Sequence, residues 1–169
     1  YQAAQNATSG SSNLAIGVYA LKSSVESRNN IAIGREALCS YIGSPTSYGF
    51  RHSDNVAIGN EVLKCNIEGS NNVAVGNCTL KYNTGGSNTV LGNMAAWRYS
   101  DNSGVFIGSR AGFCTESGYG NTIVGATAYN YGQGGSRNTV LGYGALLGVA
   151  WNSEITGDGN TALGYQSGE

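Results

Sequence analysis

Few residues of this chain carry the side chains that catalysis requires. His52 is its one histidine, so any Ser/His/Asp or Cys/His arrangement would have to use it. There is no Gly-x-Ser-x-Gly segment that would expose a nucleophilic serine. Glu154 and Asp158, four residues apart, are the best local candidates for the carboxylate pair of a glycosidase. We expect His52 to lie at the surface and these acids to be solvated, so we predict no catalytic residue and no enzyme activity.

The cysteines and glycine-rich turns do not have the spacing of a metal site. The four cysteines show no Cys-x-x-Cys pairing and no accompanying histidines, which disfavours a zinc site. The Gly-Gly segments at 85–88 and 134–137 lack the aspartate of a calcium-binding solenoid. We therefore expect four free thiols, no metal and no cofactor.

The charge balance excludes further classes of function. Nine basic and ten acidic residues give a net charge of −1, and 11% of residues are charged. Such a surface cannot neutralise a row of nucleic-acid phosphates. No apolar run approaches the about 20 residues that span a membrane. We expect neither a nucleic-acid partner nor membrane insertion.

Nine short segments recur along the chain and predict its fold. Each has three mostly apolar residues followed by glycine, and eight of the nine begin with Asn. The segments are 13–17, 30–34, 55–59, 72–76, 88–92, 104–108, 121–125, 138–142 and 160–164. Their glycines lie 16 or 17 residues apart, except for two intervals of 25 and 22. This period is too short for a pair of packed helices, and the intervening Gly, Asn and Ser residues disfavour helix.

The repeat predicts an all-β parallel β-solenoid of about nine coils of 16–17 residues. Successive coils would stack about 4.8 Å apart through backbone hydrogen bonds. We assign residues 1–12 to a partial coil or linker and residues 13–169 to the solenoid, with insertions at 41–54 and 148–159. Because Tyr1 is not a start methionine, we expect the chain to be a processed product or a piece of a longer protein.

The columns of the repeat predict how each coil is lined. We expect the residue before each glycine, such as Ile33 or Ile58, to fill the coil interior. The residue before it, such as Ala32 or Ala57, then faces the opposite side. Both faces are apolar and one thin coil cannot bury both, so the second face requires a partner, most simply another copy of the chain. The Asn column predicts left-handed turns with stacked amides, and the Gly column predicts turns without room for a side chain.

The Asn-x-Ala-Ile-Gly unit, followed by Ala-Leu and by spacers such as residues 83–88, resembles the head repeats of trimeric autotransporter (YadA-like) adhesins. It resembles still more closely the related repeats of phage tail fibres and tailspikes. The adhesin unit is shorter than the units found here. The resemblance covers residues 13–164 and implies a left-handed β-roll in an intertwined homotrimer.

The two insertions depart from the repeat and are the predicted ligand-binding segments. They gather aromatic, charged and polar side chains, which suit the CH faces and hydroxyl groups of sugars. The candidate residues are Tyr41, Tyr48, Phe50, Arg51, His52, Trp151, Glu154 and Asp158. Further rings flank the coils, including Trp97, Tyr99, Tyr119, Tyr129 and Tyr131. The alternative is that these rings cover coil edges or fill the trimer interface.

Together these features predict an extracellular homotrimeric fibre segment, most simply part of a virion tail fibre, that attaches to a glycan or protein receptor on a host cell. Three weak sites on one rigid rod would bind by avidity. The alternatives are a trimeric adhesin on a bacterial outer surface, a polysaccharide-depolymerising tailspike, and a structural shaft without a ligand.

Overall fold

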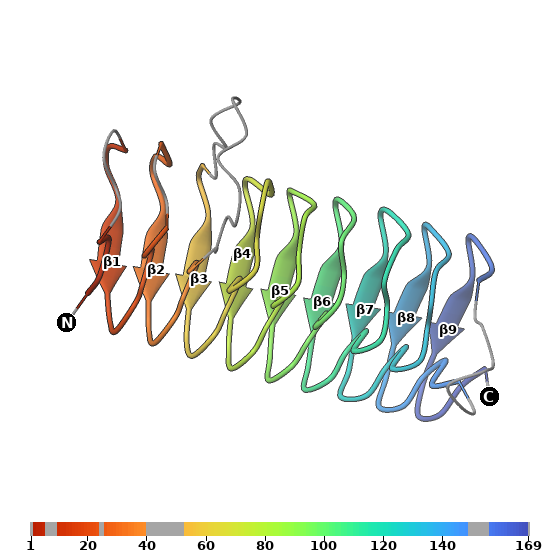
Figure 1. Ribbon diagram of the computed structural model, residues 1–169. Helices are drawn as coiled ribbons and strands as arrows, with labels where there is room; N and C mark the ends of the chain where they lie inside the picture. Colours follow the sequence, from red (N-terminus) through yellow and green to blue (C-terminus); the bar gives the residue numbers. More distant parts are fainter. Residues whose placement is uncertain (1, 6–9, 24–25, 40–52, 149–155, 169) are drawn as a thin grey trace.

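The computed structural model describes residues 2–5, 10–23, 26–39, 53–148 and 156–168, which form one parallel β-solenoid (Figure 1). Nine three-residue strands follow one another in chain order, and each pairs only with its neighbours in sequence. The strands are β1 (Leu14–Ile16), β2 (Ile31–Ile33), β3 (Val56–Ile58), β4 (Val73–Val75), β5 (Thr89–Leu91), β6 (Val105–Ile107), β7 (Thr122–Val124), β8 (Thr139–Leu141) and β9 (Thr161–Leu163). The predicted all-β solenoid and its nine motif strands are confirmed. The described residues contain no helix.

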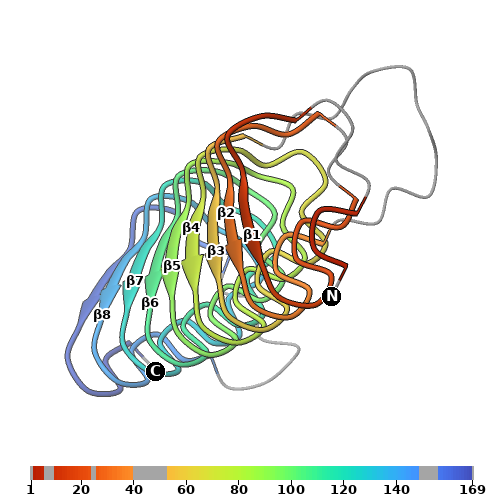
Figure 2. The same ribbon diagram turned by 90° about the vertical axis from the view of Figure 1, so that its left-hand side faces the viewer.

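Neighbouring coils stack with equivalent residues opposite one another, and we number each coil by its strand. Figure 2 shows the coils superposed along the solenoid. The hydrogen bonds between coils continue beyond the strands, for example from Leu38 N to Val62 O at 2.9 Å. The long interval between Gly34 and Gly59 does not shift the register, because Ile33 still pairs with Ile58. The repeat motif therefore fixes the stacking, whatever the length of the segment between two motifs.

The middle residue of each strand lines the coil interior, so the orientation predicted from the sequence is wrong. We call these residues the inner column: Ala15, Ala32, Ala57, Ala74, Val90, Phe106, Ile123, Val140 and Ala162. Ala57 is fully buried, whereas Ile58, which was expected inside, is 37% exposed. Strand alternation decides which residues face opposite sides but not which side is the interior. In coil 3 the interior also encloses Val62 and Leu63, beside which Ala57 fits.

The first and third residues of each strand form two outer columns. The first outer column is Leu14, Ile31, Val56, Val73, Thr89, Val105, Thr122, Thr139 and Thr161. The second is Ile16, Ile33, Ile58, Val75, Leu91, Ile107, Val124, Leu141 and Leu163. Each of these side chains is partly or largely exposed, and Leu163, for example, is 60% exposed. One face of the sheet therefore presents an unbroken aliphatic row to the outside.

Left-handed backbone conformations form the corners of each coil. In coil 3 they occur two and four residues after the glycine, at Glu61 (φ 55°) and Leu63 (φ 50°). A third precedes the Asn column, as at Asn71 (φ 60°). The sequence prediction placed this conformation on the column asparagine itself, which is wrong by one residue. The glycine column is confirmed as a site without room, because a Cβ on Gly34 would lie 2.1 Å from the carbonyl oxygen of Gly59.

The Asn column forms the predicted ladder of amides inside the solenoid. Asn30, Asn55 and Asn72 are fully buried. Asn30 Oδ1 accepts hydrogen bonds from Asn55 N at 3.0 Å and from Asn55 Nδ2 at 3.2 Å. Asn55 Oδ1 accepts in the same way from Asn72, at 3.0 and 3.1 Å. Because Asn55 and Asn72 each donate to the amide oxygen of the preceding coil, the ladder fixes the relative positions of these coils and pairs these buried polar atoms. The pairing is incomplete farther along the column, since Asn138 Nδ2 is buried without a hydrogen-bond partner.

In coil 6 one large interior side chain fills space that other coils fill with side chains at other positions. Its inner-column residue is Phe106, and its Asn position is occupied by Gly104. A Cβ on Gly104 would lie 2.5 Å from the Phe106 ring, and one on Gly112, where coil 3 has Leu63, would lie 2.4 Å from it. Tyr99 packs against Phe106 with ring centroids 4.8 Å apart. The large ring is therefore accommodated by two glycines in its own coil.

Candidate functional site

Seven of the eight candidate residues predicted from the sequence lie outside the described residues. They are Tyr41, Tyr48, Phe50, Arg51, His52, Trp151 and Glu154. The eighth, Asp158, links coils 8 and 9 through its carboxylate. Its Oδ1 accepts a hydrogen bond from Ser136 N at 2.7 Å, and its Oδ2 lies 3.5 Å from Arg137 Nη2.

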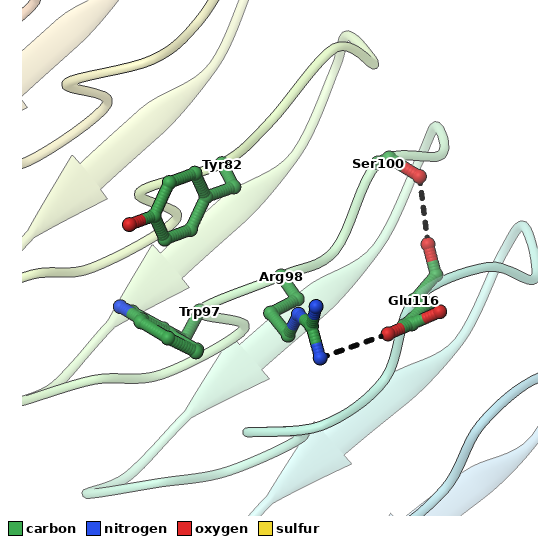
Figure 3. A pocket seen from close by; sticks show the side chains of 5 residues that line it. All are labelled: Tyr82, Trp97, Arg98, Ser100 and Glu116. Carbon is green, nitrogen blue, oxygen red and sulfur yellow. Dashed lines mark hydrogen bonds and ion pairs between the residues drawn. The ribbon is translucent and has the colours of Figure 1, made fainter.

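An open pocket of about 420 Å³ lies at the edge of coils 4 to 6. We call it the aromatic pocket, and it is lined by Tyr82, Trp97, Arg98, Ser100 and Glu116. Figure 3 shows the two rings on one side, Ser100 and Glu116 on the other, and Arg98 reaching from between them to Glu116. The pocket therefore combines an aromatic wall with hydrogen-bond donors and hydrogen-bond acceptors.

The coil backbone holds the polar side of the aromatic pocket in place. The main-chain N of Ser100 and its Oγ both donate to the carbonyl oxygen of Glu116, at 3.2 and 2.7 Å. Arg98 Nη1 lies 3.1 Å from Glu116 Oε1, and the two side chains are 49% and 57% exposed. An ion pair this exposed contributes little to stability. Its donors and acceptors are open to a ligand.

Three rings from successive coils form the aromatic side. Trp97 stacks on Phe113 with centroids 5.2 Å apart and planes 13° apart. Tyr82 packs on Trp97 nearly perpendicularly, with centroids 5.1 Å apart. The Arg110 guanidinium lies 4.8 Å from the centroid of Phe113 and extends the row. Trp97 is thereby held between two rings, while Tyr82 at the end remains 44% exposed.

The fold does not require rings at this edge. Trp97 and Phe113 both lie five residues after their glycines. The same place in other coils is taken by Lys64, Asn130 or Leu147, and those coils stack in the same way. Rings five residues after the glycine are therefore a local feature of coils 5 and 6, while Tyr131 in coil 7 has the same place, six residues after its glycine, as Tyr82 in coil 4.

An ion-pair network occupies the same edge in coils 2 to 4. Glu61 lies 2.7 Å from Lys81, 3.2 Å from Arg35 and 3.5 Å from Lys64, which also pairs with Glu36. The hydrogen bond from Lys81 holds the pKa of Glu61 below its usual value, and the same bond raises the pKa of Lys81. These ion pairs join coils 2, 3 and 4. Because each charged group already faces an opposite charge, the network is a poor binding site for a charged ligand.

The other rings singled out from the sequence divide into core and surface residues. Tyr99 and Tyr129 are fully buried, and their hydroxyls donate to the carbonyl oxygens of Gly118 and Gly134. Burial raises the pKa of Tyr129 to about 12. Tyr119 is 52% exposed, with the Arg137 guanidinium 5.8 Å from its ring centroid. Tyr99 and Tyr129 are thus interior residues, and neither fills an interface.

The described residues contain no assembled metal site and no membrane-crossing segment. Within these ranges, no three His, Cys, Asp or Glu side chains come together as metal ligands would. No helix with the length and hydrophobicity of a membrane span occurs in this part of the chain. Cys39, Cys65, Cys78 and Cys114 carry free thiols.

Comparison with known proteins yields no matching protein family, no similar curated protein and no similar solved structure. Sequence reasoning noted Trp97 as a flanking ring but did not place it in a site. The available signal was the spacing, since Tyr82, Trp97 and Phe113 recur five or six residues after the glycines of three successive coils.

Proposed function

We propose that the chain is a segment of a homotrimeric, extracellular attachment fibre that recognises a glycan on a host-cell surface. The observation that carries the proposal is the second outer column, which holds only Ile, Val and Leu along all nine strands, with Leu91 at 37% and Leu141 at 50% exposure. Monomeric soluble proteins rarely expose a continuous apolar patch on this scale. In the proposed trimer, neighbouring copies of the chain cover this face.

The best partner for this face is a second copy of the same chain. Apolar side chains recur at the coil spacing of about 4.8 Å. Only a surface with the same period matches such a row over its whole length, and another copy has that period by construction. The resemblance to trimeric adhesin and tail-fibre repeats supports three copies rather than two.

A stacked solenoid also suits attachment because it is a rigid carrier. Backbone hydrogen bonds join the described coils to one another, and the aromatic pocket opens at the edge of coils 4 to 6. Three copies would present three equal sites, so weak individual contacts add up to strong binding. We place the fibre on a virion tail; a bacterial outer surface is the alternative location.

Light scattering on the purified chain tests the assembly. We expect a mass three times that of the 17.4 kDa chain. A monomer at micromolar concentration would contradict the trimer and leave the outer columns without an explanation.

Cell binding by the labelled protein tests the attachment function. We expect saturable binding to host cells that falls at least tenfold, about 1.4 kcal/mol, when Tyr48, Phe50 and Arg51 are changed to alanine. Release of reducing sugar from host polysaccharide would instead identify a depolymerising tailspike. A trimer that binds no cell would be a structural shaft.

A further inference from the structure

We propose that the aromatic pocket is a binding site for a neutral hexose unit of a glycan, an inference that rests on the proposed attachment function and names its ligand class. The pocket volume of about 420 Å³ falls within the about 300–1,000 Å³ typical of small-ligand sites. Its opening at the coil edge leaves room for a sugar chain to continue past the bound unit.

The aromatic side of the pocket provides a surface for the apolar face of a sugar ring. Tyr82 is 44% exposed and is the free end of the row of rings. Trp97 behind it is fixed by Phe113 on one side and Tyr82 on the other. Because these rings are already ordered, binding would cost little side-chain entropy, which favours even a small ligand.

The polar side of the pocket matches neighbouring sugar hydroxyls. A hydroxyl both donates and accepts a hydrogen bond, so two adjacent hydroxyls can donate to a carboxylate and accept from a guanidinium. Arg98 and Glu116 present these two groups side by side, 3.1 Å apart. Ser100 adds a hydroxyl oxygen, and its own donor bond to the Glu116 carbonyl leaves that oxygen able to accept.

The charge of the pocket selects the kind of sugar. Arg98 and Glu116 cancel, so the pocket has no net charge among its lining residues. The nearby Lys81 ammonium is engaged by Glu61 at 2.7 Å. A uronic or sialic acid would therefore meet Glu116 without an unpaired cation to offset it. A neutral hexose forms the same hydrogen bonds without that repulsion.

The experiment titrates the purified chain with methyl glucoside, galactoside and mannoside, and with methyl glucuronide as the acidic counterpart. Trp97 fluorescence in a Trp151→Phe background and saturation-transfer NMR on the sugar protons report binding. We expect at least one neutral hexoside to bind at millimolar concentration, with the glucuronide at least tenfold weaker. Binding of no neutral hexoside, or stronger binding of the glucuronide, would overturn the proposal.

Variants locate the binding in the pocket. Tyr82→Ala and Glu116→Gln should each weaken the hexoside at least tenfold, and Glu116→Gln should bring the glucuronide closer to the neutral sugars. Tyr119→Ala is the matched control, because Tyr119 is 52% exposed beside Arg137 much as Tyr82 is beside Lys81. Thermal melting checks that each variant is folded. Equal binding by Tyr82→Ala and the control would overturn the proposal.

Cell binding distinguishes failure of the pocket from failure of the attachment function. If the unmodified protein binds cells but no neutral hexoside, the pocket inference is wrong and attachment stands. If it binds a hexoside through the pocket but no cells, the site stands and the attachment function is wrong.

Discussion

The inner and outer faces of the same three-residue strands differ in the size of their side chains and in their exposure. The inner column holds alanine in five of nine coils, and Ala32, Ala57 and Ala74 have no exposed surface. The second outer column holds only Ile, Val and Leu, yet Ile16 is 53% and Leu163 is 60% exposed. In most globular folds the larger apolar residues are the buried ones. Here the interior holds both small residues, such as Ala57, and large ones, such as Leu63 and Phe106, while the aliphatic side chains of the second outer column lie where a second molecule can cover them.

The strongest test of this comparison introduces the same charge at adjacent positions on opposite faces. Ala57→Asp would bury an unpaired carboxylate inside the coil at a cost of several kcal/mol, so we expect no folded protein. Ile58→Asp places the charge on the outer face, where water solvates it. We expect that variant to give a native β circular-dichroism spectrum and a monomer by light scattering. Identical behaviour of the two variants would contradict the assignment of the faces.

The next largest effect is expected at Phe106, the largest residue of the inner column. Phe106→Ala would leave a cavity and lower the free energy of unfolding by about 3–5 kcal/mol. Adding Gly112→Leu should recover part of this loss, because Leu63 occupies the equivalent place in coil 3 with φ 50°. Gly112→Leu alone should destabilise, since the added side chain meets the Phe106 ring. Urea unfolding of the three variants measures the coupling, and additive effects would contradict shared packing.

A smaller contrast separates the buried and exposed rows of asparagine. Asn72→Ala removes the acceptor for Asn88 N, now at 3.0 Å, inside the solenoid. The free energy of unfolding should fall by about 1–3 kcal/mol, because a buried donor loses its partner. Asn77→Ala is the control: it breaks bonds to Asn60 and Asn93 on the exposed edge, where water replaces them. Thermal melting should therefore shift clearly only for Asn72→Ala, and equal shifts would refute the difference.

The smallest expected effect concerns the charges of the outer edge. Because Lys81 lowers the pKa of Glu61 in the folded state, Glu61 stabilises the fold above its unfolded pKa of about 4.3. This contribution is lost as the pH falls through the folded pKa. Between about pH 6 and pH 3, the free energy of unfolding should fall more for the unmodified chain than for Glu61→Gln, by less than about 1 kcal/mol. Urea titrations at both pH values measure this difference, and an equal fall would show that the network contributes nothing.

The sequence by itself determined the periodic part of this protein. The nine motifs, eight of which begin with Asn, place all nine strands, and the spacing of the glycines predicts their parallel stacking. The Asn ladder and the crowded Gly column also followed, because each depends on one residue type repeated in register. These features are local to the motif, so the sequence repeats the Gly nine times and the Asn eight times.

The tertiary structure alone decided which face lies inside and which side chains meet across coils. Alternation along three residues is symmetric between the two faces, and only the volume enclosed with residues such as Leu63 breaks that symmetry. Phe106 and its two glycines, 104 and 112, form one packing unit that the column pattern does not reveal. The aromatic pocket likewise joins Tyr82 to Glu116, residues that stacking of coils brings together. A repeat can be recognised from local residue types, but these contacts depend on the size of the coil and on the neighbour that each side chain meets.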